Sequence, residues 1–445
     1  MRLDTLLSRI LLKDHSFQLV QLQSPPCECD HIIAVDELKK DPTQVKTVKS
    51  EHFITISYNE KVFYALEVMV YIIVDNVDAK AERFIFISKA DTSGYCDVKV
   101  STRLITRAIL EYLISIDPLH YLAKVQLLDK EDVSNEESPS ATSKDKPENQ
   151  TDVEVGAGSH VDQKIKEPTF VFIDCPYQFI TKISLFTRAE AQYLFPDSAD
   201  SPNKHLLSGQ KLLRWWLSII DDLLSTNFES DSIARLQIPG EEKKTINLYL
   251  RNMQFKNWQV GDIFHDSEDE LAMYRIPVFE DDPKGRFLSE LEQEGRVAAV
   301  KFSTFWLEIQ ARSEFRLGAL VSVIGARGRY KGVYTRPEDD EVVILSTMKK
   351  YFSRKHKITK EGYDTVEGAI KAHRNLRDLL RKRDNAEMLH VDGSSDSIYN
   401  ANTPAISLNP ETEKNSNAHA VQKRPPINNL NAFVVRKKPK ATKNA

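Results

Sequence analysis

The stretch HFITISYNEKVFYALEVMVYIIVDNVDAKAERFIFIS, residues 52–88, carries the clearest signals of regular structure in the chain. Within it, His52 to Tyr58, Val62 to Asp75 and Arg83 to Ser88 are rich in Phe, Tyr, Val and Ile, which favour strands. The apolar run from Val62 to Val74 is interrupted by Glu67 and is shorter than the ~20 residues that cross a bilayer. We therefore expect three neighbouring strands and no membrane span.

Helix signals follow these strands. Residues Arg103 to Ile116 place apolar side chains at helical spacing, with Ser101 or Thr102 as the cap and Asp117-Pro118 at the end. Further predicted elements are a strand from Thr169 to Ile173, helices near Ala189 to Leu194, from Ser208 to Leu224 and from Pro283, and a basic helix from about Lys360 to Leu389. The alternation of strands and helices, with no detectable internal repeat, predicts a mixed α/β architecture.

The bulk composition indicates a globular protein of a reducing compartment. The chain has 445 residues, of which 41% are hydrophobic, enough for a substantial core. Its amino terminus, MRLDTLLSRILLKDH, offers no secretion signal, and four cysteines are too few for a disulfide framework. The cluster Cys27-Glu28-Cys29-Asp30-His31 lacks the second, distant ligand pair of a zinc site, so we expect no metal.

Two stretches are too polar to build a core. Residues 129–167 lean acidic and predict a disordered insertion, while residues 391–445 predict a disordered tail that ends in a basic cluster, Arg436-Lys437-Lys438-Pro439-Lys440. Such a cluster suits a nuclear import signal or a nucleic-acid or chaperone contact, or is a solvated tail without a dedicated partner. One folded domain, residues 1–128 and 168–390, remains.

A first candidate site is SKADTSGYCDVKVSTR, residues 88–103, where a strand ends and a polar loop with Gly94 leads into a helix. Lys99 and Arg103 flank the start of that helix, so backbone amides, the helix dipole and two cations could bind a pyrophosphate. No phosphate-loop glycine signature is present, and an ordinary strand-turn-helix unit is the alternative.

Two further candidates lie later in the chain. In PNKHLLSGQKLLRWW, residues 202–216, Trp215 and Trp216 point about 100° apart on a helix, so one can line a pocket, unless both belong to the core. In FEDDPKGRF, residues 279–287, Asp281 and Asp282 stand beside Lys284 and Arg286. This pair could supply a general base held by cations, or Asp282 could serve only as a helix N-cap.

Six short motifs occur in order: SKADTSGYC at 88–96, LFTRAEAQYLFPDS at 185–198, KHLLSG at 204–209, RWW at 214–216, NWQVGDIF at 257–264 and DDPKGRF at 281–287. Together they closely resemble the fungal histone acetyltransferases of the regulator of Ty transposition family, from near the amino terminus to about residue 390. The resemblance implies one α/β acetyltransferase domain with a central mixed β-sheet surrounded by helices, similar to the CREB-binding-protein acetyltransferases.

The resemblance also implies an activity and partners. Members of this family transfer acetyl from acetyl-CoA, without a metal, to newly made histone H3, on a core lysine near the DNA entry site and on tail lysines. The expected partners are histone H3–H4, a nucleosome-assembly-type chaperone and the anti-silencing chaperone. The expected location is the nucleus, where this acetylation supports replication-coupled nucleosome assembly and genome stability. No membrane association is expected.

Site residues are implied at matching positions. The expected contacts of acetyl-CoA are Ala90, Asp91, Thr92, Lys99, Val100, Ser101, Thr102, Arg103, Phe186, His205, Leu206, Leu207 and Trp215. The expected lysine tunnel comprises Asp91, Tyr193, Trp216, Asp281 and Asp282, with Asp282 as the proton acceptor and Lys284 as a site of self-acetylation. The sequence departs from the family at Glu190, so no cofactor contact is carried over to that residue.

The chemistry sets a requirement on the site. An acceptor lysine with a pKa near ~10.4 must lose a proton before it attacks a thioester, which costs about 4.6 kcal/mol at pH 7. We expect direct attack without an acyl-enzyme, aided by Asp282 if that carboxyl is desolvated near Trp216, Tyr193 and Phe279. Such a mechanism requires Asp281 and Asp282 to meet the turn after residue 88 beside Trp216. A non-enzymatic chromatin adaptor and a small-molecule N-acetyltransferase are the alternatives.

Overall fold

The computed structural model describes residues 1–125, 178–195, 198–264, 269–312, 315, 320–337, 343–344 and 389–395. These residues belong to one compact unit, Met1–Asn402. The predicted insertion at 129–167, the strand predicted at 169–173, the basic helix predicted from about Lys360 to Leu389 except for its last residue, and the tail beyond residue 395 lie outside the described residues.

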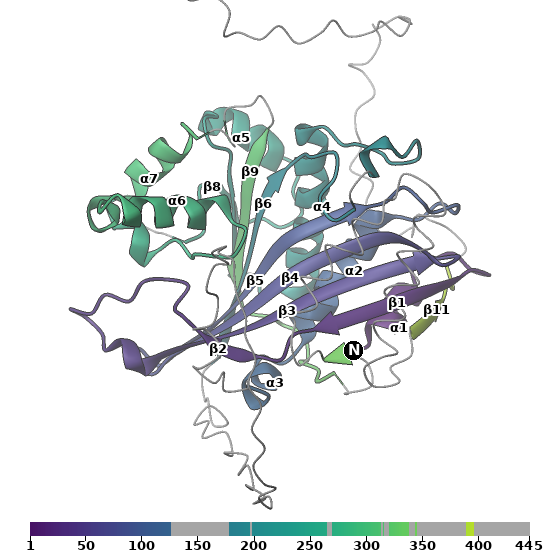
Figure 1. The fold of residues 1–445 in the computed structure, drawn as a ribbon, viewed down its shortest axis with the longest axis horizontal. Coiled ribbons are helices and arrows are strands. Elements are labelled where there is room, and N and C mark those ends of the chain that lie inside the picture. Colours follow the sequence, from purple (N-terminus) through teal and green to yellow (C-terminus); the bar gives the residue numbers. More distant parts are fainter. Residues whose placement is uncertain are drawn as a thin grey trace, which may run out of the picture. The chain divides into compact units, whose positions relative to one another are not determined.

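A central mixed sheet organises the described part of the chain (Figure 1). Its strand order is β10-β1-β3-β4-β5-β6-β9-β7-β8, with β2 paired to β3 and β11 paired to β1. Its strands are β1 (Ser16–Gln23), β2 (Cys27–Cys29), β3 (Val45–Tyr58), β4 (Lys61–Asp75), β5 (Lys80–Thr92), β6 (Phe179–Arg188), β7 (Ile233–Gln237), β8 (Trp258–Val260), β9 (Val321–Gly328), β10 (Val343–Ile344) and β11 (Leu389–Asp392). Strand β5 pairs with β6 in parallel and with β4 in antiparallel fashion, which confirms the mixed sheet.

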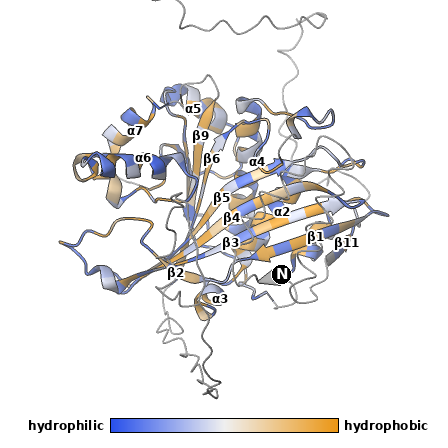
Figure 2. Ribbon diagram, in the orientation of Figure 1, coloured by the Kyte–Doolittle hydropathy of each residue, from blue (hydrophilic) through white to orange (hydrophobic). Residues whose placement is uncertain are grey.

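The three strands predicted from residues 52–88 are confirmed as β3, β4 and β5 at the centre of this sheet. Along β4 the side chains alternate between two cores: Val68, Val70 and Ile72 join the main core, whereas Met69 and Tyr71 join a smaller one on the other face. Because both faces are covered, the strand is almost continuously apolar, as the colouring in Figure 2 shows.

The helices in the described residues are α1 (Leu3–Ser8), α2 (Thr102–Ser115), α3 (Pro118–Ala123), α4 (Gly209–Asn227), α5 (Lys243–Leu250), α6 (Pro283–Gln293) and α7 (Phe302–Ile309). Helices α2 and α4 pack together over the main core, and their N-caps are Ser101 and Ser208. Helices α6 and α7 form a separate apolar cluster beside β8 and β9 (Figure 1). The helices predicted around residues 103–116 and 208–224 and from Pro283 are thus confirmed.

Among the described residues, no helix has the length and apolar character needed to span a membrane.

Two local predictions were wrong. Residues 189–194 form a loop and not a helix, because the backbone amides of Tyr193 and Leu194 donate to the Asp91 carboxylate. Residues 389–392 form β11, whereas a helix was predicted to end at Leu389 and a disordered tail to begin at residue 391. Strand β11 pairs with β1, and Val391 is only 2% exposed, so these residues belong to the domain.

A buried arginine fastens β5 to the end of α2. Arg83 is fully buried, and its guanidinium donates hydrogen bonds to the carbonyl oxygens of Ile114 and Ile116, at 2.8 and 2.6 Å, and to Thr181 Oγ1 on β6 at 2.9 Å. Carbonyl groups at a helix C-terminus have no partner within the helix and carry the negative end of its dipole. Arg83 therefore satisfies this end of α2 and holds the helix on the sheet.

Replacing Arg83 by Met should lower the free energy of unfolding by about 3 kcal/mol or more, because it leaves buried carbonyl groups without a donor. The matched control is Arg329→Met, since Arg329 is 48% exposed in its ion pair with Asp231 and such pairs contribute at most ~1 kcal/mol. Denaturant unfolding of both variants measures the difference. Equal losses of stability would contradict the anchoring role of Arg83.

Candidate active site

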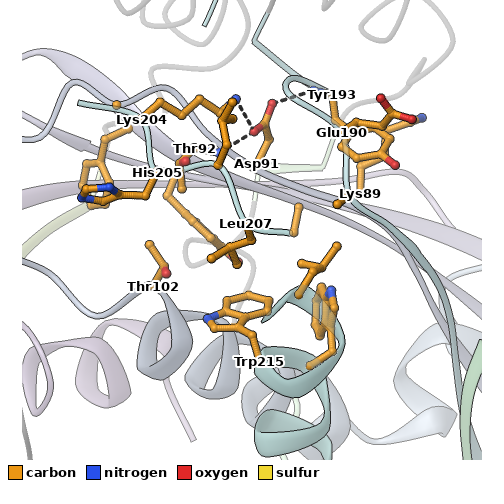
Figure 3. Close-up of a pocket in the computed structure, with 18 of the residues that line it drawn as sticks. Lys89, Asp91, Thr92, Thr102, Glu190, Tyr193, Lys204, His205, Leu207 and Trp215 are labelled. Carbon is orange, nitrogen blue, oxygen red and sulfur yellow. Dashed lines mark hydrogen bonds and ion pairs between the residues drawn. The ribbon is translucent and has the colours of Figure 1, made fainter. Parts of the chain in front are cut away.

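A pocket of about 550 Å³ opens where β5 and β6 end. Because these two strands are parallel, their carboxyl ends meet at the same edge of the sheet, where the start of α2 and the first turns of α4 also contribute to the walls. Figure 3 shows Thr102 and His205 toward one end of the pocket, Tyr193, Glu190 and Lys89 toward the other, and Trp215 and Leu207 between them.

A β-bulge sets the direction of the side chains at the end of β5. Ile87 pairs with Val68 and Lys89 pairs with Glu67, so Ser88 is an extra residue on β5. Bulges of this kind bend a strand and re-aim the residues that follow. After the bulge, Lys89, Ala90, Asp91 and Thr92 all line the pocket.

Asp91 joins β5 to the loop on the far side of the pocket. Its Oδ2 atom accepts hydrogen bonds from the backbone amides of Tyr193, Leu194 and Phe195, at 2.8, 2.9 and 3.3 Å. Its Oδ1 atom pairs with Lys204 Nζ at 2.8 Å, and this ammonium also donates to Ser198 Oγ at 2.7 Å. Amides that donate to a carboxylate are not available for helical hydrogen bonds, which explains why residues 189–194 form a loop.

The approach of this loop to β5 is very close at Gly94. Gly94 has φ +84°, and a Cβ atom there would lie 2.5 Å from Ser201 Oγ and 2.9 Å from the Lys204 nitrogen. The position thus requires glycine both for its backbone conformation and for space. It keeps residues 201–204 against the turn that follows β5.

One end of the pocket is suited to an anion. Lys99, Val100 and Thr102 line it where α2 begins, and Ser101 caps the helix by accepting a hydrogen bond from the Leu104 amide. A helix N-terminus beside an exposed lysine favours phosphate groups. Ser101 and Arg103, predicted as cofactor contacts, do not line the pocket.

The middle of the pocket is apolar and aromatic. Trp215 and Trp216 both line it, with ring centroids 4.7 Å apart in an edge-to-face arrangement, although Trp216 is otherwise buried in the core. Leu206 and Leu207 are 55% and 39% exposed in this structure. Such side chains can cover the apolar part of a long ligand.

The other end carries a tyrosine and charged groups. Tyr193 Oη donates a hydrogen bond to the carbonyl oxygen of Arg188, and burial raises the pKa of this phenol to about 12, so it is neutral at physiological pH. Glu190 lines the same end and pairs with Arg188 at 2.8 Å. Lys89 pairs here with Asp281, at 2.5 Å.

The acidic pair is divided between two environments. Asp281 is exposed and reaches Lys89, so this segment and the end of β5 do come together. Asp282 is fully buried: it caps α6 by accepting a hydrogen bond from the Lys284 amide, and Lys284 Nζ lies 3.4 Å from its Oδ2 atom. Burial raises the pKa of the Asp282 carboxyl, although Lys284 acts in the opposite direction. Asp281, Asp282 and Lys284 do not line the pocket, and Arg286 is exposed.

Most of the predicted residues are gathered at this pocket. Those that line it are Ala90, Asp91, Thr92, Lys99, Val100, Thr102, Phe186, Tyr193, His205, Leu206, Leu207, Trp215 and Trp216. Sequence reasoning missed the roles of Lys89 and Lys204, because nothing in their local sequence indicates that each meets a carboxylate distant in the chain.

The three cysteines that the structure describes, Cys27, Cys29 and Cys96, show no sign of a site. Cys27 and Cys29 lie on β2, paired with β3, and burial raises the pKa of the Cys29 thiol to about 12. Cys96 lines the pocket, where burial raises its pKa to about 11, so it is a poor nucleophile. In the part of the chain that the structure describes, no group of three or more His, Cys, Asp or Glu is arranged to hold a metal.

The comparisons with known proteins place the chain among the acetyltransferases, a class that takes its acetyl group from acetyl-CoA. Residues 3–379 match the family model "Histone acetyltransferase KAT11-type domain". The chain belongs to this histone acetyltransferase family and is an enzyme.

Relatives with known names agree with this assignment. The chain is 29% identical over 344 residues to histone acetyltransferase RTT109 of Candida albicans, covering 77% of this chain and 92% of the relative. It is 33% identical over 153 residues to histone acetyltransferase rtt109 of Schizosaccharomyces pombe, covering 31% of this chain and 39% of the relative. The crystal structure of Rtt109 from Aspergillus fumigatus shares the fold, with a TM-score of 0.63 at 20% identity, over 89% of this chain and all of that one.

The pairing of Lys204 with Asp91 should stabilise the loop that closes the pocket. Both side chains are almost fully buried, 4% and 7% exposed, so Lys204→Met leaves a buried carboxylate without its cation and should cost about 3 kcal/mol in unfolding free energy. In an Asp91→Asn background the same substitution should cost much less, which a double-mutant cycle measures. Lys211→Met, at an exposed position on α4, is the control. Additive effects would contradict the pairing.

Proposed function

We propose that this enzyme acetylates lysines of newly synthesised histone H3, and that the pocket holds acetyl-CoA along its length with the acceptor lysine at the Tyr193 end. The observation that carries the proposal is the polarity of the pocket. An anion-binding helix start lies at one end, an apolar middle follows, and a neutral phenol with paired charges lies at the other end.

The cofactor matches these three parts in order. Its pyrophosphate fits the amides at the start of α2 with Lys99 beside them, as helix N-termini bind phosphate groups. The hydrocarbon parts of its pantetheine arm, which two amide groups join, fit against the side chains of Leu206, Leu207 and Trp215. The thioester then lies near Tyr193 and Trp216, where the acceptor lysine can approach.

In the proposed reaction the neutral amine of the acceptor lysine attacks the thioester carbonyl of acetyl-CoA directly. The new N–C bond forms, the C–S bond breaks, and the coenzyme leaves as its thiol after gaining a proton. Holding the amine and the thioester in contact contributes most of the acceleration. The hydroxyl oxygen of Tyr193, whose proton is donated to the Arg188 carbonyl, can accept a hydrogen bond from the amine and so position it, and the acidic pair takes up its proton.

The role proposed for Asp282 as proton acceptor rests on its burial, which makes the carboxyl more basic. Because its side chain does not line the pocket, the role requires the carboxyl to approach the amine once both substrates are bound. Catalytic contacts often form only in that complex. Asp281, already in contact with Lys89 at this end, is the neighbouring carboxylate that would serve if Asp282 does not.

The histone substrate follows from the family, and its finer features are part of the proposal. We propose that the modified residues are a core lysine near the DNA entry site and tail lysines of H3, that a nucleosome-assembly-type chaperone and the anti-silencing chaperone present H3–H4, and that the enzyme acts in the nucleus. The names of the relatives, all histone acetyltransferases, support a chromatin substrate. The resulting modification would support replication-coupled nucleosome assembly and genome stability.

Lys99→Gln should raise the KM for acetyl-CoA about tenfold, because it removes the cation beside the pyrophosphate, a contact of ~1.4 kcal/mol. Acetyl-pantetheine lacks the pyrophosphate, so its KM should not change. Steady-state kinetics with both donors gives the comparison, with Lys211→Met as a control for a nearby lysine outside the pocket. An equal rise for both donors would place the pyrophosphate elsewhere.

Asp282→Asn should lower kcat for H3–H4 about 100-fold, as expected for loss of a general base, with the KM for acetyl-CoA unchanged. Asparagine also caps helices well, so α6 should remain folded. Acetyl transfer is measured with and without a histone chaperone, which should raise the rate for the wild type. Activity equal to the wild type would remove Asp282 from the role and direct attention to Asp281→Asn.

A further inference from the structure

Lys89 places an ammonium group of the protein itself at the end of the pocket proposed for the acceptor lysine. Its Nζ atom lies 2.5 Å from Asp281 Oδ2 and 3.2 Å from Glu67 Oε1. The side chain is 24% exposed and lines the pocket near Tyr193 and Glu190 (Figure 3). One cation therefore joins a buried carboxylate of the sheet to a carboxylate at the surface.

The bulge in β5 produces this arrangement. Because Ser88 is the extra residue, Lys89 stands directly opposite Glu67 on β4, and Ser88 Oγ donates a hydrogen bond to the same carboxylate at 3.0 Å. Glu67 is only 2% exposed. A buried carboxylate needs a nearby cation, so Glu67 fixes the stem of Lys89 while its tip stays within reach of the pocket.

The backbone of Asp281 is held in a strained conformation. Its φ of +62° lies in the left-handed region, which is unfavourable for residues other than glycine, although aspartate tolerates it. The neighbouring Glu280 pairs with Lys49 on β3, and Asp281 pairs with Lys89 on β5. Ion pairs with two strands thus hold this strained segment against Lys89, which lines the pocket, while the Asp281 carboxylate is 62% exposed.

An acceptor lysine meets this cluster mostly in its protonated form, because its ordinary pKa of ~10.4 is well above 7. Lys89 is protonated as well: burial disfavours its ammonium, but Glu67 and Asp281 outweigh that effect and raise its pKa. Two ammonium groups repel each other, and each is attracted to the same exposed carboxylate.

We propose that Lys89 limits the affinity of the acceptor subsite for lysine by competing with the ammonium of the acceptor lysine for Asp281. The inference rests on the proposed function of this pocket. The acceptor enters as a protonated primary amine on a peptide and takes over the contact with Asp281, while Lys89 keeps its contact with Glu67. Lys89 thereby weakens the binding of charged acceptor side chains, and uncharged side chains do not experience this competition.

The test compares two H3 peptides, one with the acceptor lysine and one with norleucine, its uncharged analogue, in its place. The key variant, Glu67→Gln/Lys89→Met, removes the competing cation together with the buried carboxylate that needs it. Its affinity for the lysine peptide should rise about fivefold, the range of a partly exposed ion pair, while its affinity for the norleucine peptide should not change. Binding is measured by calorimetry with coenzyme A present. Lys89→Arg, which keeps the charge, should match the wild type.

The Asp281→Asn substitution closes the cycle and provides a second test should the double variant be unstable. By itself it should weaken binding of the lysine peptide and not of the norleucine peptide, and added to the double variant it should abolish the gain in affinity. Equal changes for both peptides, or weaker binding of lysine by the double variant, would overturn the proposal. Acetylation of H3–H4 by the same wild-type preparation tests the proposed function separately, since these binding measurements do not require turnover.

Discussion

The pocket depends on the hydrogen bonds and the ion pair that the carboxylate of Asp91 makes. A single side chain at the end of β5 receives the amides of residues 193–195 and the ammonium of Lys204, so one wall of the pocket is fastened to the other. Because little solvent reaches these groups, the charge-assisted hydrogen bonds are strong, and removing one partner would destabilise the folded protein. The loop that carries Tyr193 and the segment that carries His205 are positioned by this one carboxylate.

A second buried polar group, Arg83, holds the end of α2 that lies away from the pocket. Arg83 binds the carbonyl groups at its C-terminus, while the N-terminus of the same helix, capped by Ser101, faces the pocket. Since β5 carries both Arg83 and Asp91, the central strand of the sheet positions α2 and the pocket loop together. The apolar core supplies most of the stability, and these two buried charged groups determine how the elements around the pocket are arranged.

Local sequence was sufficient wherever local interactions decide the structure. The strands from residue 52 to residue 88 follow from runs of β-branched and aromatic residues, and α2, α4 and α6 follow from apolar spacing together with Ser101, Ser208 and Asp282 as caps. Local sequence did not predict the loop at residues 189–194, because hydrogen bonds from this segment to Asp91 replace the helix that its pattern indicates. It also failed for β11, whose residues are polar in part and form a strand only by pairing with β1.

The sequence by itself determined the mixed α/β class, the family and many of the residues that line the pocket, because motifs and periodicity are properties of neighbouring residues. Only the tertiary structure decided which charges meet. Lys89 reaches Asp281 across 192 residues of chain and Lys204 reaches Asp91 across 113, while Asp282 turns inward to Lys284. Ion pairs depend on distance in space, and the local sequence of either partner contains no information about that distance.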